Sequence, residues 1–196
     1  KKNIKLGTLT FKNTLSENKV YYLKMAVRLN DSTRIYFYTK VQSGSGYHLD
    51  YYLAFVLKFH NNLFDKATMD ENASYLETAA DTIDDNLESV SINSGREAVS
   101  FGNMEVKQET KPRITLQEMN NTYTVIRVNT ILSTEISDGV IQYYDLSETY
   151  KLRYTADRMY LLDYERTMDA YYNESIIDSA NNLISLGIQN EKNISY

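Results

Sequence analysis

The sequence predicts an α+β fold in which an antiparallel sheet is covered on one face by two helices and the chain ends in a C-terminal helix. Three patterns lead to this prediction. Apolar residues alternate with polar ones along residues 20–42 and again along residues 123–166, as in half-buried strands. Residues 50–87 carry apolar residues at helical spacing. An Asp-Gly step at residues 138–139 is a hairpin signal, which makes its neighbouring strands antiparallel.

The composition limits the domain count and the function classes. The chain has 196 residues and is 42% hydrophobic, so residues 1–196 are predicted to form a single α+β domain around one core. It has no cysteine, which excludes disulfides, thiol catalysis and zinc–thiolate sites. The net charge of −5 argues against nucleic acid as a partner. No run approaches the roughly 18 apolar residues of a membrane span, so we expect membrane attachment only through an anchor outside this chain.

Residues 1–42 are predicted to contribute N-terminal strands. One face of the first strand carries Tyr21, Leu23, Met25, Val27 and Leu29, and one face of the next carries Ile35, Phe37 and Val41. These two sets lie on the same side of a hairpin when paired residue numbers sum to an even number, for example Leu29 with Ile35. The turn is then centred on residues 31–33. An earlier, less regular run over residues 4–11 is predicted to add a strand, with a bulge at Gly7.

Residues 50–88 are predicted to form a helical pair that follows a flexible break at residues 43–46. The first helix, over residues 50–64, has a broad apolar face that includes Tyr52, Val56, Phe59 and His60. The second helix, over residues 69–87, has a stripe of Met69, Ala73, Leu76, Ala80, Ile83 and Leu87. Its outer face is acidic.

Residues 90–166 are predicted to form the antiparallel sheet. Strands are expected over residues 90–92, 98–106 and 114–119, ahead of the best-defined part. A two-residue turn at Asp138-Gly139 places Val125 opposite Leu152. A second tight turn within residues 155–158 places Leu152 opposite Leu161. The two turns therefore predict one apolar row across three strands.

These registers also divide the tyrosines between the two faces of the sheet. The face under the helices is predicted to carry Tyr150 and Tyr154 with Leu146, Leu152 and Leu161, and the opposite face Tyr143, Tyr160 and Tyr164 with Lys151 and Arg153. A C-terminal helix is predicted within residues 167–187, starting near Asn173 and stopped by Gly187. Residues 188–196 are expected to form a frayed tail.

No residue pattern dictates a chemistry. His60 lies on the apolar stripe of the first helix and is interpreted as a packed histidine, and His48 lies in a loop. The acidic group Asp81, Asp84, Asp85 and Glu88 is interpreted as a solvated helix face rather than as a calcium or acid–base site. The three aspartates Asp157, Asp163 and Asp169 are expected in a turn, a strand and a helix entry, and not on one face. We therefore predict no catalytic residue, no cofactor and no metal ligand.

The second face of the N-terminal hairpin is the candidate partner-binding surface. The even-sum register gathers Lys24, Arg28, Tyr36, Tyr38 and Lys40 on that face. The set is similar to a base-stacking surface, and an ordinary solvated sheet face is the plain alternative. Among the functional interpretations a protein partner is preferred, since tyrosine and arginine often anchor protein interfaces.

The order of elements from Tyr51 to Arg166 resembles a known family. Two helices, a linker and long antiparallel strands end in the run YDLSETYKLRYTADRMYLLDYE. This order resembles the nuclear transport factor two-like, cystatin-like domains, which implies a curved sheet with the leading helices on its concave side. Among extracytoplasmic members it is similar to the scaffold domains of conjugation and type IV secretion channels, including those of Gram-positive bacteria. Residues 1–42 depart from this pattern, and a helix-grip fold accounts for the order nearly as well.

We therefore expect a non-enzymatic extracytoplasmic module, at the cell surface or membrane-anchored, that acts through a protein partner or as a homo-oligomer. The resemblance implies a bacterial conjugation or secretion apparatus as its setting. Two alternatives stay open. A ligand-binding or hydrolytic pocket in the sheet concavity would converge on His60, Tyr150 and Arg127, and a viral or phage structural protein would form a large symmetric assembly.

Overall fold

The computed structural model describes residues 8–78, 86–137, 139–171, 177–178 and 183–184. The chain divides into two compact units, Lys1–Tyr47 and His48–Tyr196. Both contain antiparallel strands, and the second adds helices, so the α+β class is confirmed. That all 196 residues form one domain stays a prediction. Within the described ranges, no helix is both long and apolar enough to cross a membrane.

The first unit contains a hairpin of β1 (Val20–Arg28) and β2 (Arg34–Gln42). Its register is even-summed, as predicted, but Ile35 pairs with Val27 instead of Leu29. The reason lies in the turn. The Asn30 side chain accepts hydrogen bonds from the backbone N–H groups of Ser32 (3.0 Å) and Thr33 (2.8 Å), which centres the turn on Asp31. A shift of two residues keeps every side chain on its predicted face.

The strand predicted over residues 4–11 is wrong where the structure describes it. Residues 8–11 have no ladder partner in the described part of the chain, and a strand exists only where its backbone groups pair with a neighbour. Residues 4–7, including the bulge predicted at Gly7, lie outside the described residues. The hairpin is instead closed by a backbone hydrogen bond from Asn18 to the carbonyl of Ser43 (2.8 Å).

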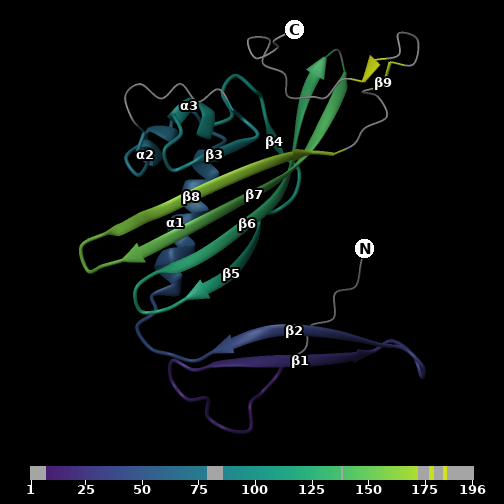
Figure 1. Ribbon diagram of the computed structural model, residues 1–196, viewed down its shortest axis with the longest axis vertical. Helices are drawn as coiled ribbons and strands as arrows, with labels where there is room; N and C mark the ends of the chain where they lie inside the picture. Colours follow the sequence, from purple (N-terminus) through teal and green to yellow (C-terminus); the bar gives the residue numbers. More distant parts are fainter. Residues whose placement is uncertain (1–7, 79–85, 138, 172–176, 179–182, 185–196) are drawn as a thin grey trace. The chain divides into compact units, whose positions relative to one another are not determined.

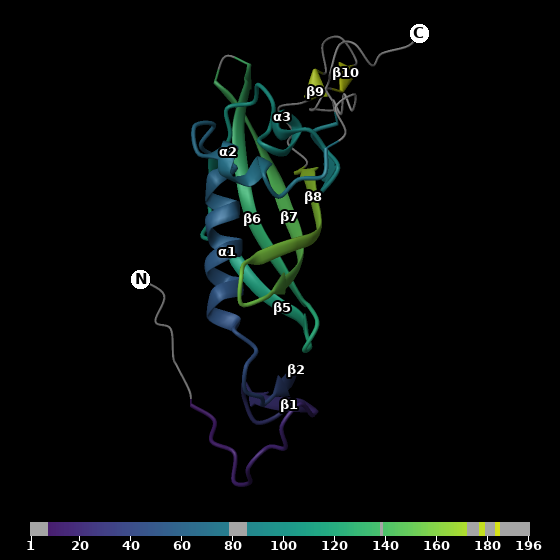
Figure 2. The same cartoon turned by 90° about the vertical axis from the view of Figure 1, so that its left-hand side faces the viewer.

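The second unit begins with α1 (Leu49–Asn62), which confirms the first predicted helix. It buries Tyr52, Val56, Phe59 and His60 against the sheet, and Figure 2 shows it lying along one face of the strands. The Tyr52 hydroxyl accepts a hydrogen bond from the backbone N–H of Tyr154 (2.9 Å), which fixes the first turn of α1 to the sheet.

The second predicted helix, over residues 69–87, is wrong in its length. Only α2 (Met69–Ala73) is helical in the described part of that range. Beyond it, the backbone N–H of Glu77 donates to the carbonyl of Ile92 (2.8 Å) and the Thr78 hydroxyl to that of Ser94 (2.7 Å). These tertiary hydrogen bonds replace helical ones, and an apolar stripe at helical spacing does not reveal them. Leu76 and Leu87 of the predicted stripe are described and are not helical, whereas Ala80 and Ile83 lie outside the described residues.

The main sheet is a curved antiparallel sheet (Figure 1). Its strands are β3 (Ser89–Ser91), β4 (Lys107–Gln108), β5 (Arg113–Met119), β6 (Thr124–Ser137), β7 (Val140–Tyr154) and β8 (Met159–Ala170). The order is β3-β8-β7-β6-β4, and β5 also pairs with β6. The strands predicted over residues 90–92 and 114–119 are confirmed as β3 and β5.

The strand predicted over residues 98–106 is wrong, because α3 (Arg96–Val99) and a loop occupy it. Phe101 (φ 65°) and Gly102 (φ 58°) adopt left-handed conformations that turn the chain back on itself. The helical carbonyls of Ala98 and Val99 then point to the Arg166 side chain, which donates to both (3.1 and 2.8 Å).

The predicted turn between β6 and β7 is confirmed, but the residue pairs predicted farther from this turn are wrong. Ser137 pairs with Val140 as the Asp-Gly signal predicts, and a bulge at Ile136 then shifts the register by one residue. Leu152 consequently faces Thr124, and Val125 lies on the outer face. The predicted row of Val125, Leu152 and Leu161 is therefore wrong in its first member.

The second predicted turn, within residues 155–158, is confirmed, and Leu152 pairs with Leu161 as it predicts. A bulge at Leu162 then adds one outward-facing residue to β8. As a result Tyr164 is buried opposite Tyr150, and its predicted place on the outer face is wrong. Tyr150 is buried as predicted, and Tyr154 packs against the same core.

The C-terminal helix is wrong at every described residue of its range. Residues 167–170 continue β8, with Met168 buried, because their alternation follows that of the strand. Further on, β9 (Ile177–Asp178) and β10 (Leu183–Ile184) pair as two short antiparallel strands, which suits their β-branched isoleucines. The other residues of that helix, including Asn173 and Gly187, and the tail at 188–196 lie outside the described residues.

Candidate functional site

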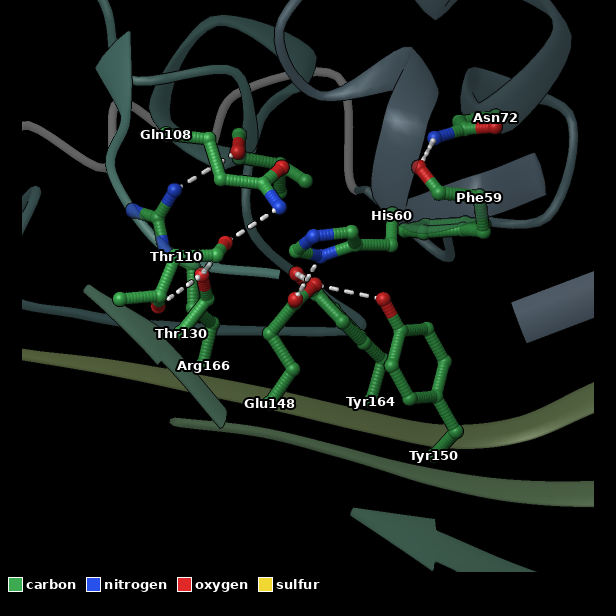
Figure 3. Close-up of polar contacts among 11 residues, drawn as sticks. Phe59, His60, Asn72, Gln108, Thr110, Thr130, Glu148, Tyr150, Tyr164 and Arg166 are labelled. Atoms are coloured by element: carbon green, nitrogen blue, oxygen red, sulfur yellow. Dashed lines mark hydrogen bonds and ion pairs between the residues drawn. The ribbon is translucent and has the colours of Figure 1, made fainter. Parts of the chain in front are cut away.

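The core of the second unit contains a cluster of ionisable side chains, shown in Figure 3. His60 comes from α1, Glu148 and Tyr150 from β7, and Tyr164 and Arg166 from β8. All five side chains are fully buried. We call His60, Glu148, Tyr150 and Tyr164 the buried carboxylate cluster, because three of its members bind the carboxylate of the fourth.

Each donor of the cluster has a defined place on Glu148. Nδ1 of His60 makes a short contact with Oε2 of Glu148. The Tyr150 hydroxyl donates to Oε1 over 2.5 Å, and the Tyr164 hydroxyl donates to the same oxygen over 3.1 Å. A buried carboxylate is tolerated only when its oxygens accept such hydrogen bonds. The cluster therefore links helix and sheet through one acceptor group.

Arg166 supplies positive charge beside this carboxylate, because it is the direct cross-strand neighbour of Glu148. Its guanidinium donates to the carbonyls of Val99 (2.8 Å), Leu87 (3.0 Å) and Ala98 (3.1 Å) and lies 4.3 Å from the centre of the Phe101 ring. It thus holds the loop around α3 on the sheet. A paired buried charge is far less costly than an isolated one.

The two tyrosines of the cluster are held in their neutral form. Burial, followed by the negative charge of Glu148, raises the pKa of Tyr150 well above its ordinary value. The same two causes raise the pKa of Tyr164, while the charge of Arg166 opposes them. Both hydroxyls consequently remain donors to the carboxylate over the physiological pH range.

The cluster can fix structure, but its packing leaves its polar atoms out of reach of solvent. The His60 ring packs edge-on against Phe64 (5.2 Å between ring centres), and Phe59 packs against both Tyr150 and Tyr164. Nε2 of His60 is buried and has no hydrogen-bond partner among the described residues. The arrangement is that of a core network which sets the position of α1 on the sheet.

The five predicted partner-binding residues lie together, as the even-sum register requires. Lys24, Arg28, Tyr36, Tyr38 and Lys40 are exposed on one face of the β1–β2 hairpin, which we call the basic–aromatic face. Tyr36 is 46% exposed and Tyr38 is 71% exposed. The Lys24 ammonium lies 4.3 Å from the centre of the Tyr36 ring and 5.8 Å from that of Tyr38. Such cation–π contacts orient the rings on the surface.

The other face of the hairpin is less covered than a core face. Ile35 is 42% exposed and Phe37 is 49% exposed, while Leu23 and Met25 are half-buried. The alternation in the sequence therefore gives the correct faces of the two strands but not the depth of their burial.

The remaining candidates are dispersed. His48 precedes α1 with a φ of 51° and packs against Tyr51 and Tyr154. Arg127 is exposed on the face of β6 opposite to Tyr150, so the three residues expected to line a pocket do not converge. Glu88 is exposed, and Asp81, Asp84 and Asp85 lie outside the described residues. Asp157 lies in its turn, but Asp163 and Asp169 share the outer face of β8, contrary to expectation.

A groove of about 310 Å³ lies where α1 meets α2. It is lined by Phe55, Lys58, Phe59, Glu71, Asn72, Ser74 and Tyr75. An exposed ion pair between Lys58 and Glu71 (2.6 Å) spans it, and it does not include His60 or Tyr150. In the described parts of the chain, no group of three or more His, Cys, Asp or Glu side chains could hold a metal ion.

Sequence reasoning missed Glu148 and Arg166. Glu148 could have been found, because it alternates with Leu146, Tyr150 and Leu152 and therefore belongs to the core face. A carboxylate on a core face needs a buried donor, and His60 on the apolar stripe of α1 is the matching group. Arg166 could not have been found in this way, because the bulge at Leu162 reverses the alternation of inward and outward residues ahead of Arg166.

Comparison of the chain with models of protein families, with curated proteins and with solved structures gave no match.

Proposed function

We propose that this protein is a non-enzymatic binding or scaffold module that acts through protein–protein contacts. The observation that carries the proposal is the exposed basic–aromatic face. It gathers two tyrosines and three cations on one side of a two-stranded sheet. Tyrosine and arginine are enriched among the side chains that dominate binding at protein interfaces.

The interior of the second unit supports this function over a ligand pocket. A pocket in the concavity would need space beside His60 and Tyr150, and both side chains are fully buried in the packed carboxylate cluster. Arg127, the third residue expected there, lies on the other face of the sheet. The helix α1 thus fills the space that a substrate would use.

The proposed setting is extracytoplasmic, in a bacterial conjugation or secretion apparatus. It rests on the resemblance in element order to nuclear transport factor two-like scaffold domains. The packing of α1 on one face of a curved antiparallel sheet supports it, because the resemblance implies that arrangement.

The test is the double change Tyr36→Ala and Tyr38→Ala. It should weaken self-association or partner capture, since truncation of an interface hot spot costs about 2 kcal/mol or more. Its cost to folding should be at most about 1 kcal/mol, as for exposed cross-strand pairs. Association is measured by sedimentation velocity and by co-purification from the source cells, and folding by circular dichroism.

Tyr171→Ala is the matched control, because Tyr171 is an exposed tyrosine of the other unit (45% exposed). A double variant that loses thermal stability but associates like the wild type would show that Tyr36 and Tyr38 are structural. A large symmetric assembly of the isolated chain would instead favour a viral or phage structural protein.

A further inference from the structure

The two units carry opposite charge. Residues 1–47 contain nine Lys and Arg against two Asp and Glu, a net charge of +7. Residues 48–196 contain twelve against twenty-four, a net charge of −12. The overall value of −5 conceals this asymmetry, which favours electrostatic association between unlike surfaces.

The positive charge of the hairpin is confined to one face. All four cations of β1 and β2 lie on the side of the hairpin that carries the basic–aromatic face, since Arg34 shares that side; we call Lys24, Arg28, Arg34 and Lys40 the basic strip. Arg28 and Arg34 are direct cross-strand neighbours, an arrangement of like charges that disfavours the isolated hairpin. Arg28 pairs with Asp31 (2.6 Å), but the other three cations form no ion pair within the described residues.

The outer face of the main sheet carries a matching set of carboxylates. Asp145 on β7 and Asp163, Glu165 and Asp169 on β8 are exposed and lie on one face, and we call them the acidic strip. Asp145 and Asp169 are direct cross-strand neighbours, again an unfavourable pair of like charges. No cation forms an ion pair with any of the four in the described part of the chain.

The two strips have the same length along a strand. Each lies across two adjacent antiparallel strands, and each covers a six-residue interval along one strand, from Arg34 to Lys40 and from Asp163 to Asp169. At roughly 3.3 Å per residue, both intervals are about 20 Å long. Among the described residues, no other segment of the same unit packs over either strip.

We propose that the basic strip of one copy binds the acidic strip of a second copy of this chain. This inference rests on the proposed function, because it names the protein that the basic–aromatic face contacts. Docking relieves the like-charge pairs on both sides and adds Tyr36 and Tyr38 to the contact. Since the two strips are different surfaces, association continues until it closes into a reciprocal dimer or a ring.

A protein partner fits the basic–aromatic face better than a nucleic acid does. Base stacking needs free aromatic ring faces, whereas the Lys24 ammonium lies over the rings of Tyr36 and Tyr38. A polyanion would also meet the charge of −12 that residues 48–196 carry. The acidic strip instead offers four carboxylates over the same six-residue interval as the four cations.

The test is a charge exchange in the full chain, followed by sedimentation velocity. Variant A carries Lys24→Glu and Lys40→Glu, and variant B carries Glu165→Lys and Asp169→Lys. The control carries Lys12→Glu and Lys19→Glu, which changes the net charge by as much as variant A but lies outside the basic strip. Circular dichroism melts establish that each variant is folded.

The wild type and the control should associate, with an association constant that falls about tenfold or more between 50 and 500 mM NaCl. Variants A and B should each be monomeric, and an equimolar mixture of A and B should associate again. The mixture restores the opposite-charge contact, because the acidic strip is unchanged in A and the basic strip is unchanged in B, whereas the exchanged strip of each variant has no net charge. Loss of folding in a variant cannot produce this recovery.

A wild type that is monomeric at 50 mM NaCl, or a mixture of A and B that stays monomeric, overturns the inference. Binding of a fluorescent oligothymidine without self-association also overturns it and assigns the basic strip to a polyanion. If self-association persists in A and B but is lost on Tyr36→Ala and Tyr38→Ala, the inference fails and the scaffold function stands. Association that is insensitive to all of these changes contradicts both.

Discussion

The buried carboxylate cluster makes a strong prediction for Glu148→Gln, a nearly isosteric change that removes one charge. The amide oxygen can still accept from the Tyr150 and Tyr164 hydroxyls, which now bond to Oε1 at 2.5 and 3.1 Å. The amide NH₂ then faces Nδ1 of His60, so the imidazole must carry its proton on Nε2. That nitrogen is buried and has no acceptor among the described residues.

The cost follows from these changes. One unsatisfied buried donor costs about 1–3 kcal/mol. The two tyrosine hydrogen bonds change from charge-assisted to neutral, which weakens each by about 1 kcal/mol. Arg166 also loses the buried negative charge on the neighbouring strand. We expect a loss of about 4 kcal/mol from a typical stability of about 5–15 kcal/mol.

Urea unfolding measures this loss. With a slope of about 2 kcal/mol per molar urea, the midpoint of Glu148→Gln should fall by about 2 M. Glu165→Gln is the matched control, because Glu165 lies exposed on the outer face of the same sheet, and its midpoint should not change. A Glu148→Gln midpoint within 0.5 M of the wild type (about 1 kcal/mol) would refute the role given to the cluster.

Two further predictions concern the same core. The raised pKa values of Tyr150 and Tyr164 mean that the unfolded chain releases two protons near pH 10 which the folded chain retains. Stability is therefore complete below about pH 10 and falls above it by up to about 2.7 kcal/mol per pH unit, a slope that Tyr164→Phe should halve in urea titrations at pH 8–11. Leu152→Ala should cost about 2–5 kcal/mol because Leu152 is fully buried, whereas Val125→Ala on the outer face should cost less than about 1 kcal/mol. Equal losses for Leu152→Ala and Val125→Ala would contradict the register with a bulge at Ile136.

Local signals in the sequence were sufficient where both partners of a contact are close in the chain. The even-sum hairpin, the turn at residues 138–139 and the pairing of Leu152 with Leu161 all follow from alternation and turn residues. The same holds for the basic–aromatic face, which depends only on the hairpin parity. Each of these features is decided within about thirty residues, where alternation and turn chemistry act together.

Features that depend on contacts between residues far apart in the chain could not be predicted from local signals. The second helix stops at Ala73 because Glu77 and Thr78 bond to the loop after β3, and the loop at residues 98–106 is shaped by Arg166 on β8. The buried carboxylate cluster joins His60 to Glu148 across 88 positions. The sequence pattern places a carboxylate and a histidine on core faces. The contact between them depends on the packing of α1 on the sheet.

The bulge at Leu162 shows how one residue can reverse a prediction, and it can be tested by deletion. Leu161 faces the core, Leu162 and Asp163 both face outward, and Tyr164 faces the core again. Deleting Leu162 leaves the pairs Leu152–Leu161 and Lys151–Asp163 adjacent and every later residue on its present face, so it should cost less than about 2 kcal/mol.

Deleting Glu165 has no such solution. In one outcome, the residues after the deletion change face and Arg166 turns to the outer face. In the other, β8 loses its bulge at Leu162, so that Tyr164 leaves the core and Asp163 enters it. Both outcomes break the hydrogen bonds of a buried charge, at a cost of at least about 3 kcal/mol. Urea unfolding of the two deletion variants compares these costs directly. If the Leu162 deletion is as destabilising as the Glu165 deletion, the bulge does more than reset the alternation, and the placement of Tyr164 and Arg166 needs another cause.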